Sequence, residues 1–239
     1  MPAHVDEYAP IADIYDAWCL EVVEDIPHYL GMAQGAETPI VELAAGSGRI
    51  AVPLAEAGWD VIAVDPSDAM RARLADNARR AGVRERIDIR AGDLLKPGLT
   101  GTYDRVLIPF RSLLHLPGDT ERLAAFGAAH AMTSEHGFLA FDVFAPTPED
   151  IEATQGRWHH RESGARERAD WHRPDGTTRI EVEMRGRTTT LVLHPAPAQH
   201  WLDLVEAAGF EVITVWGDFA GGPVRTDGTG DLVVIAQRR

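Results

Sequence analysis

Cysteine and basic residues are scarce in this chain of 239 residues. Its one cysteine, Cys19, excludes an internal disulfide and a metal cluster held by thiolates. The 23 Lys and Arg residues against 37 Asp and Glu give a formal net charge of −14. Because nucleic-acid binding relies on Lys and Arg to neutralise phosphates, this charge argues against a nucleic-acid partner.

Long apolar runs are also missing. None approaches the roughly 18 residues that a membrane span needs. The first residues, Met1 to Glu7, have neither the basic region nor the apolar core of a secretory signal. We therefore expect a cytoplasmic chain with no membrane partner. With 45% hydrophobic and 25% charged residues, the composition is typical of one globular domain spanning residues 1–239.

Apolar runs alternate with helix-like segments, which predicts an α/β fold with a parallel sheet covered on both faces. The last two apolar runs follow each other without an intervening helix, so we expect them to form an antiparallel hairpin. The fold class is therefore a Rossmann-like, seven-stranded, mostly parallel sheet with an antiparallel last strand. The expected strands lie near 40–44, 60–64, 87–90, 104–109, 137–143, 210–216 and 231–237, and the expected helices over 10–30, 48–58, 67–81, 119–132 and 198–208.

One polar, Pro-punctuated stretch, residues 145–197, interrupts the alternation. Three runs within it, 166–172, 177–184 and 188–193, predict a small antiparallel sheet, and Pro174-Asp175-Gly176 is typical of a hairpin turn between the first two. An insertion after a strand's carboxyl end overhangs the ligand crevice of an open α/β sheet. We therefore expect a substrate lid; a flap without a role in the site, or one that forms a dimer, is the alternative.

The first strand ends in a turn that is typical of nucleotide binding. Gly46 and Gly48 lie in a segment that satisfies G-x-G-x-x-[GA], and glycine lets the backbone approach a ligand and adopt positive φ. Taken alone, this segment also fits a nicotinamide dinucleotide site. Three acids, Glu42, Asp65 and Asp93, then follow at or near the ends of the first three strands. A pyrophosphate beside Glu42 would be repelled, whereas a ligand with a cationic head, a ribose diol and an adenine amino group, such as S-adenosylmethionine, suits such acids.

With these motifs in order, the whole chain resembles the class I S-adenosylmethionine-dependent methyltransferases, in particular the bacterial small-molecule group that methylates sugar amines and glycine-type amines. The resemblance implies an enzyme of class EC 2.1.1.- that uses S-adenosyl-L-methionine, releases S-adenosyl-L-homocysteine and acts on a small molecule, often in natural product biosynthesis. It divides the chain into a helical cover (1–36), a cofactor-binding core (37–144), the lid (145–197) and a closing helix with a terminal hairpin (198–239). The motifs that carry it are Tyr8-Ala9, Ile14-Tyr15-Asp16, Glu42-x-Ala44-x-Gly46-x-Gly48-Arg49, Val64-Asp65-Pro66-Ser67-x-x-Met70, Gly92-Asp93-Leu94, Tyr103-Asp104, Ile108-Pro109-Phe110-x-Ser112-Leu113-x-His115-Leu116, Ala208-Gly209-Phe210 and Trp216-Gly217-Asp218-Phe219.

The resemblance assigns a role to most of these residues. Asp65 would accept from both ribose hydroxyls, Asp93 from the adenine amino group, and Tyr8 and Tyr15 would fold over the cofactor. Ala44 replaces the family's usual first glycine, which is tolerable only with negative φ, and 194–199 departs from the family's usual helix start after the lid. The full expected cofactor set is Tyr8, Tyr15, Glu42, Ala44, Gly46, Gly48, Arg49, Asp65, Pro66, Met70, Asp93, Leu94 and Pro109.

The methyl group of a sulfonium is already activated, so catalysis needs positioning and, for an acceptor that loses a proton, a base. His115 follows the fourth strand, and the ordinary histidine pKa near 6.5 suits proton transfer at neutral pH; a histidine that packs in the loop or caps a helix is the alternative. Asp142, at the end of the fifth strand, could orient an amine or hydroxyl or be a solvated carboxylate. Tyr15 completes the expected catalytic set.

The acceptor is expected to be an amine, or else a hydroxyl or an electron-rich aromatic carbon. Aromatic residues of the lid could shield it through their faces, or simply form the core of the insertion. No metal site is expected, because no H-E-x-x-H pattern occurs. The chain is expected to act as a monomer or homodimer. The alternative functions are a non-catalytic binding module and an NAD-dependent oxidoreductase. The expected substrate residues are Phe110, Ser112, His115, Phe144, Trp158, Trp171 and Trp216.

Overall fold

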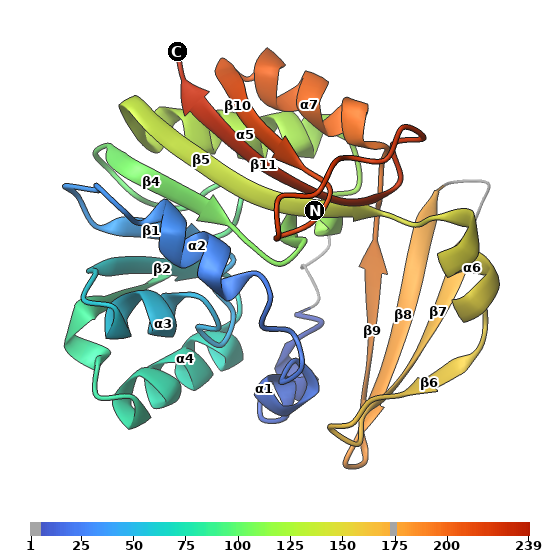
Figure 1. The fold of residues 1–239 in the computed structure, drawn as a ribbon. Coiled ribbons are helices and arrows are strands. Elements are labelled where there is room, and N and C mark those ends of the chain that lie inside the picture. Colours follow the sequence, from blue (N-terminus) through green and yellow to red (C-terminus); the bar gives the residue numbers. More distant parts are fainter. Residues whose placement is uncertain (1–5, 173–175) are drawn as a thin grey trace.

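A computed structural model describes residues 6–172 and 176–239. Its main element is a seven-stranded sheet in the order β10-β11-β5-β4-β1-β2-β3 (Figure 1). β11 runs antiparallel to both neighbours, and the remaining neighbours are parallel, so the predicted fold class is confirmed. The strands are β1 (Ile40–Leu43), β2 (Val61–Asp65), β3 (Ile87–Ala91), β4 (Tyr103–Ile108), β5 (Thr133–Ala145), β10 (Phe210–Trp216) and β11 (Gly230–Arg238).

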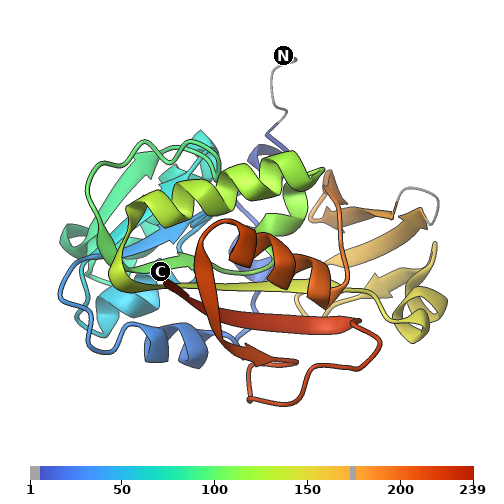
Figure 2. The ribbon, with the colours of Figure 1, turned by 90° about the horizontal axis from the view of Figure 1, so that it is seen from above.

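Helices cover both faces of this sheet. On one face, α5 (Asp119–Met132) and α7 (Ala198–Ala207) bury Phe126 and Trp201 against it, and Figure 2 shows these helices side by side. On the other face, α2 (Ile26–Met32), α3 (Ala51–Glu56) and α4 (Asp68–Arg80) bury Tyr29, Leu54 and Leu74. This two-sided burial explains why the first two strands are nearly continuous apolar runs.

The N-terminal cover differs from the single helix expected over 10–30. It consists of the 3-10 helix η1 (Ala9–Ile11), α1 (Tyr15–Trp18) and α2. Pro27 explains the break, because proline lacks an amide donor and is tolerated only in the first turn of a helix. It lies at the start of α2, directly after Ile26. The prediction of one continuous helix was therefore wrong.

The insertion forms a second sheet of four strands, in the order β6-β7-β8-β9, where three were expected. The additional strand, β6 (Trp158–His160), is short; the others are β7 (Arg166–His172), β8 (Thr177–Met184) and β9 (Arg187–Leu193). β5 leads to this sheet through α6 (Pro148–Thr154), a helix that the sequence analysis missed and that begins with a capping box of Thr147 and Asp150. Of the expected hairpin turn, Pro174 and Asp175 lie outside the described residues.

The second sheet, β6 to β9, is called the lid sheet after its expected role. Residues that are paired across its strands share a face, and the two faces carry different side chains. The row Glu167, Val182 and Thr189 belongs to the face that meets the N-terminal cover. There the Trp18 Nε1 donates to Glu167 at 3.1 Å, and the Thr189 hydroxyl donates to the Glu7 carbonyl at 2.5 Å. The opposite face carries ion pairs such as Arg168–Glu181, at 2.8 Å.

The two glycines of the first turn have different structural roles. A Cβ at Gly48 would lie 2.9 Å from the Leu74 Cγ and 3.2 Å from Val52, whereas a Cβ at Gly46 would meet nothing within 4 Å. Both have positive φ, 89° and 55° respectively. Gly48 is therefore required by helix packing as well as by backbone conformation, and Gly46 by conformation alone.

We predict that Gly48→Ala lowers the free energy of unfolding by about 2–5 kcal/mol, the sum of overpacking and left-handed strain. Gly46→Ala is the matched control and carries only the strain, about 1–2 kcal/mol. Urea denaturation of both variants measures the difference. Equal losses would contradict the packing role of Gly48.

Candidate active site

The turn after β1 lies at the carboxyl edge of the sheet, where open α/β folds bind ligands. Ala44 has φ of 57°, which contradicts the expectation that this residue keeps negative φ. A left-handed alanine costs roughly 1–2 kcal/mol. The turn is fixed by hydrogen bonds to β2: the Ala45 amide donates to the Val64 carbonyl at 3.0 Å and the Gly46 amide to the Asp65 Oδ2 at 2.8 Å.

Glu42 lies at the end of β1 with only 2% of its surface exposed. Burial raises the pKa of its carboxyl to about 8, and the nearby Asp65 adds to the rise while Arg49 opposes it. The Glu42 Oε2 is buried and has no hydrogen-bond partner among the described residues. A buried acceptor without a partner is costly, so this atom favours a ligand that brings a cation or a donor.

Asp65 ends β2 and is buried. Its Oδ1 accepts from the Ser67 amide at 2.9 Å and its Oδ2 from the Gly46 amide. Burial raises the pKa of this carboxyl, and the two amides act against the rise. Because a carboxylate has about four lone-pair sites, two acceptor sites remain for further donors such as a ribose diol.

The residues expected to contact the adenine differ in their burial. Pro66 is exposed, whereas Met70 is buried in a cluster with Ile11 and Tyr15 of the N-terminal cover. Asp93 is exposed after β3, and its Oδ1 accepts from the Leu95 and Lys96 amides. These bonds show that Asp93 shapes its own turn.

Arg49 follows the glycines and is paired with an acid that sequence reasoning missed. Its guanidinium bonds to both carboxylate oxygens of the buried Asp25, at 2.7 and 2.5 Å. Burial alone would lower the pKa of Arg49, but Asp25 outweighs it and the net shift is upward. The guanidinium also lies 4.1 Å from the centre of the Phe110 ring. Arg49 thus joins the first turn to the loop after β4.

His115 lies in the 3-10 helix η3 (Ser112–His115) after β4, and Tyr8 reaches it from the N-terminal cover. The Tyr8 hydroxyl is 2.8 Å from the His115 Nε2, and the His115 Nδ1 is 3.9 Å from the Glu7 carboxylate. The Tyr8 ring packs edge-on against Tyr15, with centroids 5.7 Å apart. Burial raises the pKa of the Tyr8 phenol, so its hydroxyl stays protonated. The structure thus brings together three of the expected residues, and Glu7 was missed.

Asp142 is buried and engaged with the protein itself. The Tyr29 hydroxyl donates to its Oδ1 at 2.5 Å, and the Phe110 and Arg111 amides donate to Oδ1 and Oδ2 at 2.7 and 3.0 Å. Burial raises the pKa of this carboxyl to about 6. Tyr29 and Asp25 were not predicted as site residues, although their i, i+4 spacing in the sequence indicates one helix face.

Some of the expected substrate residues lie near β5 and the loop after β4, whereas others lie elsewhere. Phe144 lies 6.2 Å from Trp171 across β5 and the lid, and Arg111 lies over Phe144 at 4.7 Å. The Ser112 hydroxyl donates to the carbonyl of the buried Pro109 at 2.7 Å. The structure does not bring the other two tryptophans to this group. Trp158 pairs with Arg168 on the charged face of the lid sheet, and Trp216 packs against His28.

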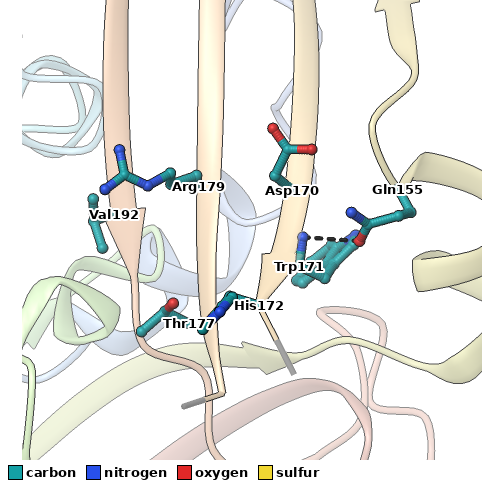
Figure 3. Close-up of a pocket in the computed structure, with 7 residues that line it drawn as sticks. All are labelled: Gln155, Asp170, Trp171, His172, Thr177, Arg179 and Val192. Atoms are coloured by element: carbon teal, nitrogen blue, oxygen red, sulfur yellow. Dashed lines mark hydrogen bonds between the residues drawn. The ribbon is translucent and has the colours of Figure 1, made fainter. Parts of the chain in front are cut away.

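A cavity of about 480 Å³ opens on the insertion, and all of its lining residues lie between 155 and 192 (Figure 3). Figure 3 shows Asp170, Arg179 and Val192 side by side on neighbouring strands, and the Trp171 amide donating to Gln155 at 2.9 Å. Of the expected substrate residues, only Trp171 lines it. The chemistry-bearing residues lie instead at the carboxyl edge of the main sheet.

In 6–172 and 176–239 no helix has the length and apolar character to cross a membrane. Within the same residues, no group of three or more His, Cys, Asp or Glu side chains could hold a metal ion.

Comparison with known proteins adds to this geometry. Residues 40–137 match the sequence profile of a family described as a methyltransferase domain. A glycine/sarcosine N-methyltransferase from Halorhodospira halochloris is 26% identical over 185 residues, which cover 76% of this chain and 69% of that protein.

Two solved structures share the fold. The CcbJ methyltransferase from Streptomyces caelestis superposes with a TM-score of 0.78 at 22% identity, over 90% of this chain and 96% of that one. The S-adenosylmethionine-bound amino pentose methyltransferase CalS10 from Micromonospora echinaspora gives 0.64 at 20% identity, over 95% of each chain. The profile match makes residues 40–137 a methyltransferase domain, and the structural likenesses show the fold of the S-adenosylmethionine-dependent methyltransferases, both as the sequence predicted.

The residues at the first turn fit S-adenosylmethionine. The unpartnered Glu42 oxygen suits its cationic head, Asp65 keeps acceptor sites, and the space beside Gly46 is open. This fit makes a prediction about pH. If the cation pairs with ionised Glu42, bound ligand lowers the pKa of Glu42 below about 8, and binding releases a proton between the two values.

We therefore predict that the dissociation constant of S-adenosylmethionine falls as pH rises towards about 8 and then levels off. The slope reaches at most about tenfold per pH unit, because one proton is released. Isothermal titration calorimetry of wild type and Glu42→Gln measures it; the ligand's own amine titrates in both, so the difference between the profiles reports Glu42. The exposed Glu37→Gln is the control and keeps the wild-type profile. A Glu42→Gln profile that matches wild type would refute the contact.

Proposed function

We propose that this methyltransferase transfers a methyl group to the nitrogen of a small amine, with Tyr8 and His115 at the acceptor. The hydrogen bond between the Tyr8 hydroxyl and the His115 Nε2 carries this proposal. When bound, S-adenosylmethionine supplies an activated methyl group. An ammonium acceptor must lose a proton before its lone pair can attack, so a hydroxyl linked to an imidazole is the group that this reaction needs.

The proton has a defined route in this proposal. The Tyr8 oxygen accepts the proton of the ammonium acceptor while its own phenol proton moves to the His115 Nε2. No phenolate forms in this transfer, which suits a phenol whose pKa burial has raised. The Glu7 carboxylate, 3.9 Å from the other ring nitrogen, favours the imidazolium that results. Phe144 and Trp171 supply apolar surface for the rest of the acceptor.

The names of the similar proteins support an amine. The Halorhodospira relative is named for glycine and sarcosine N-methylation, and CalS10 is described as an amino pentose methyltransferase. Both descriptions concern acceptors with an amino group or its derivative. The net charge of −14 also favours a cationic acceptor over an anionic one.

The test is transfer of labelled methyl groups to a panel of glycine, sarcosine and amino sugars, beside hydroxyl and indole compounds. We predict that His115→Ala lowers kcat on the accepted amine by roughly 10²–10⁴-fold, the usual contribution of a placed base. Tyr8→Phe, which keeps the ring that packs on Tyr15, gives a loss in the same direction. In both variants the affinity for S-adenosylhomocysteine is expected to stay within about threefold of wild type, which corresponds to less than about 1 kcal/mol of binding free energy.

His200→Ala is the matched control, because His200 also hydrogen-bonds a side-chain oxygen, that of Asp119 at 2.8 Å, but lies on α7. It keeps the wild-type kcat. Labelling confined to hydroxyl or indole compounds would contradict the amine acceptor, and an unchanged His115→Ala would contradict the role of the imidazole.

A further inference from the structure

Two consecutive residues that are not glycine, Phe110 and Arg111, have left-handed backbone, with φ of 57° and 58°. This conformation is unfavourable for residues with a Cβ and persists only where the surroundings hold it. Together with Pro109, the pair forms the connection from β4 to η3, the helix that carries His115. Something must hold this turn in place.

Asp142 on β5 provides that hold. Its two oxygens accept one hydrogen bond each from the amides of the strained residues, 2.7 Å from Phe110 and 3.0 Å from Arg111. Only 3% of Asp142 is exposed, so water cannot replace these bonds. A carboxylate is suited to the task because it only accepts, and both amides donate.

The carboxylate is itself held by Tyr29 of α2. The fully buried Tyr29 hydroxyl donates to the Asp142 Oδ1 at 2.5 Å, so α2 fixes the direction of the carboxyl group. On the other side of the turn, Arg49 lies over the Phe110 ring and is paired with Asp25. Asp25 is the N-cap residue of α2 and Tyr29 lies within this helix, so one helix supports the turn twice.

We infer that Asp142 is a positioning residue: with Tyr29 it holds the Phe110–Arg111 turn in left-handed backbone and thereby sets the place of His115 against Tyr8. This inference replaces the expectation that Asp142 touches the acceptor, since its oxygens bond to the turn and to Tyr29. Its kinetic consequence rests on the proposed function, but its structural consequence does not.

The experiment is hydrogen–deuterium exchange of the segment 109–116 without ligand. Asp142→Asn keeps the volume but replaces one acceptor by an NH₂ group that faces a backbone donor. Exchange of this segment is expected to accelerate roughly 10–100-fold, the worth of hydrogen bonds to a charged group. Tyr29→Phe keeps the ring and is expected to accelerate the same segment less, by roughly 3–10-fold. The segment 61–65 in β2 is the internal reference and stays unchanged.

Asp231→Asn is the matched control. Asp231 bonds to the Arg111 guanidinium at 2.7 Å but not to the backbone of the turn, so exchange stays within about twofold of wild type. A second test adds glycine, which adopts left-handed backbone at little cost. The double variant Asp142→Asn/Arg111→Gly is expected to exchange more slowly at 109–116 than Asp142→Asn. Arg111→Gly alone is the reference for this double variant.

Kinetics separate the two proposals. Asp142→Asn is expected to lower kcat at least tenfold, with S-adenosylhomocysteine affinity within about threefold. Altered exchange together with no amine methylation by wild type would leave the positioning role standing and overturn the proposed function. If Asp142→Asn loses kcat while exchange at 109–116 is unchanged, the positioning role is overturned. It is also overturned if exchange in 61–65 accelerates as much as exchange in 109–116. If Asp142→Asn does not fold, Tyr29→Phe decides by the same criteria.

Discussion

Four carboxylates are buried at the carboxyl edge of the main sheet or in the segment that covers it: Asp25, Glu42, Asp65 and Asp142. Taking an ionised carboxylate out of water costs several kcal/mol unless partners replace the water. Asp25 has the Arg49 guanidinium, and Asp65 and Asp142 each have two backbone amides. Much of the local backbone, including the first turn and the loop after β4, is shaped by the need to supply those donors.

Glu42 departs from this rule, and the departure connects the fold to its chemistry. Its Oε2 has no hydrogen-bond partner among the described residues, and burial raises the pKa of its carboxyl to about 8. The methyl donor has a cationic head, so the missing partner and the ligand are complementary. Three of the four carboxylates are compensated within the protein, so Glu42 is the one whose charge a cationic ligand would offset.

The sheet could be predicted because its strands follow from apolar runs of ordinary length, and the antiparallel end followed from the missing helix before β11. The errors have local physical causes. Pro27 lies in the first turn of α2 and so interrupts the single helix that was expected, and β6 has only three residues, Trp158–His160, too few to show an alternation. Ala44 is left-handed because the hydrogen bonds of Ala45 and Gly46 to β2 outweigh its own preference.

Only some of the candidate site residues could be predicted from the sequence. Acids at strand ends could be found because topology brings the carboxyl ends of parallel strands to one edge. The link between Tyr8 and His115 could not be derived from spacing, because 107 residues separate them and only the path of the N-terminal cover joins them. Arg49 could be predicted as a site residue because it belongs to the glycine motif. Its partner Asp25 could not, because it lies in a segment without a recognisable motif.

Gly48, whose place beside Leu74 excludes a side chain, has a consequence for how such chains are recognised. A relative that had lost its donor site would still need this glycine in order to fold, whereas Gly46 would be under weaker demand. Matches to the paired-glycine signature therefore report inheritance of the scaffold as much as retention of catalysis.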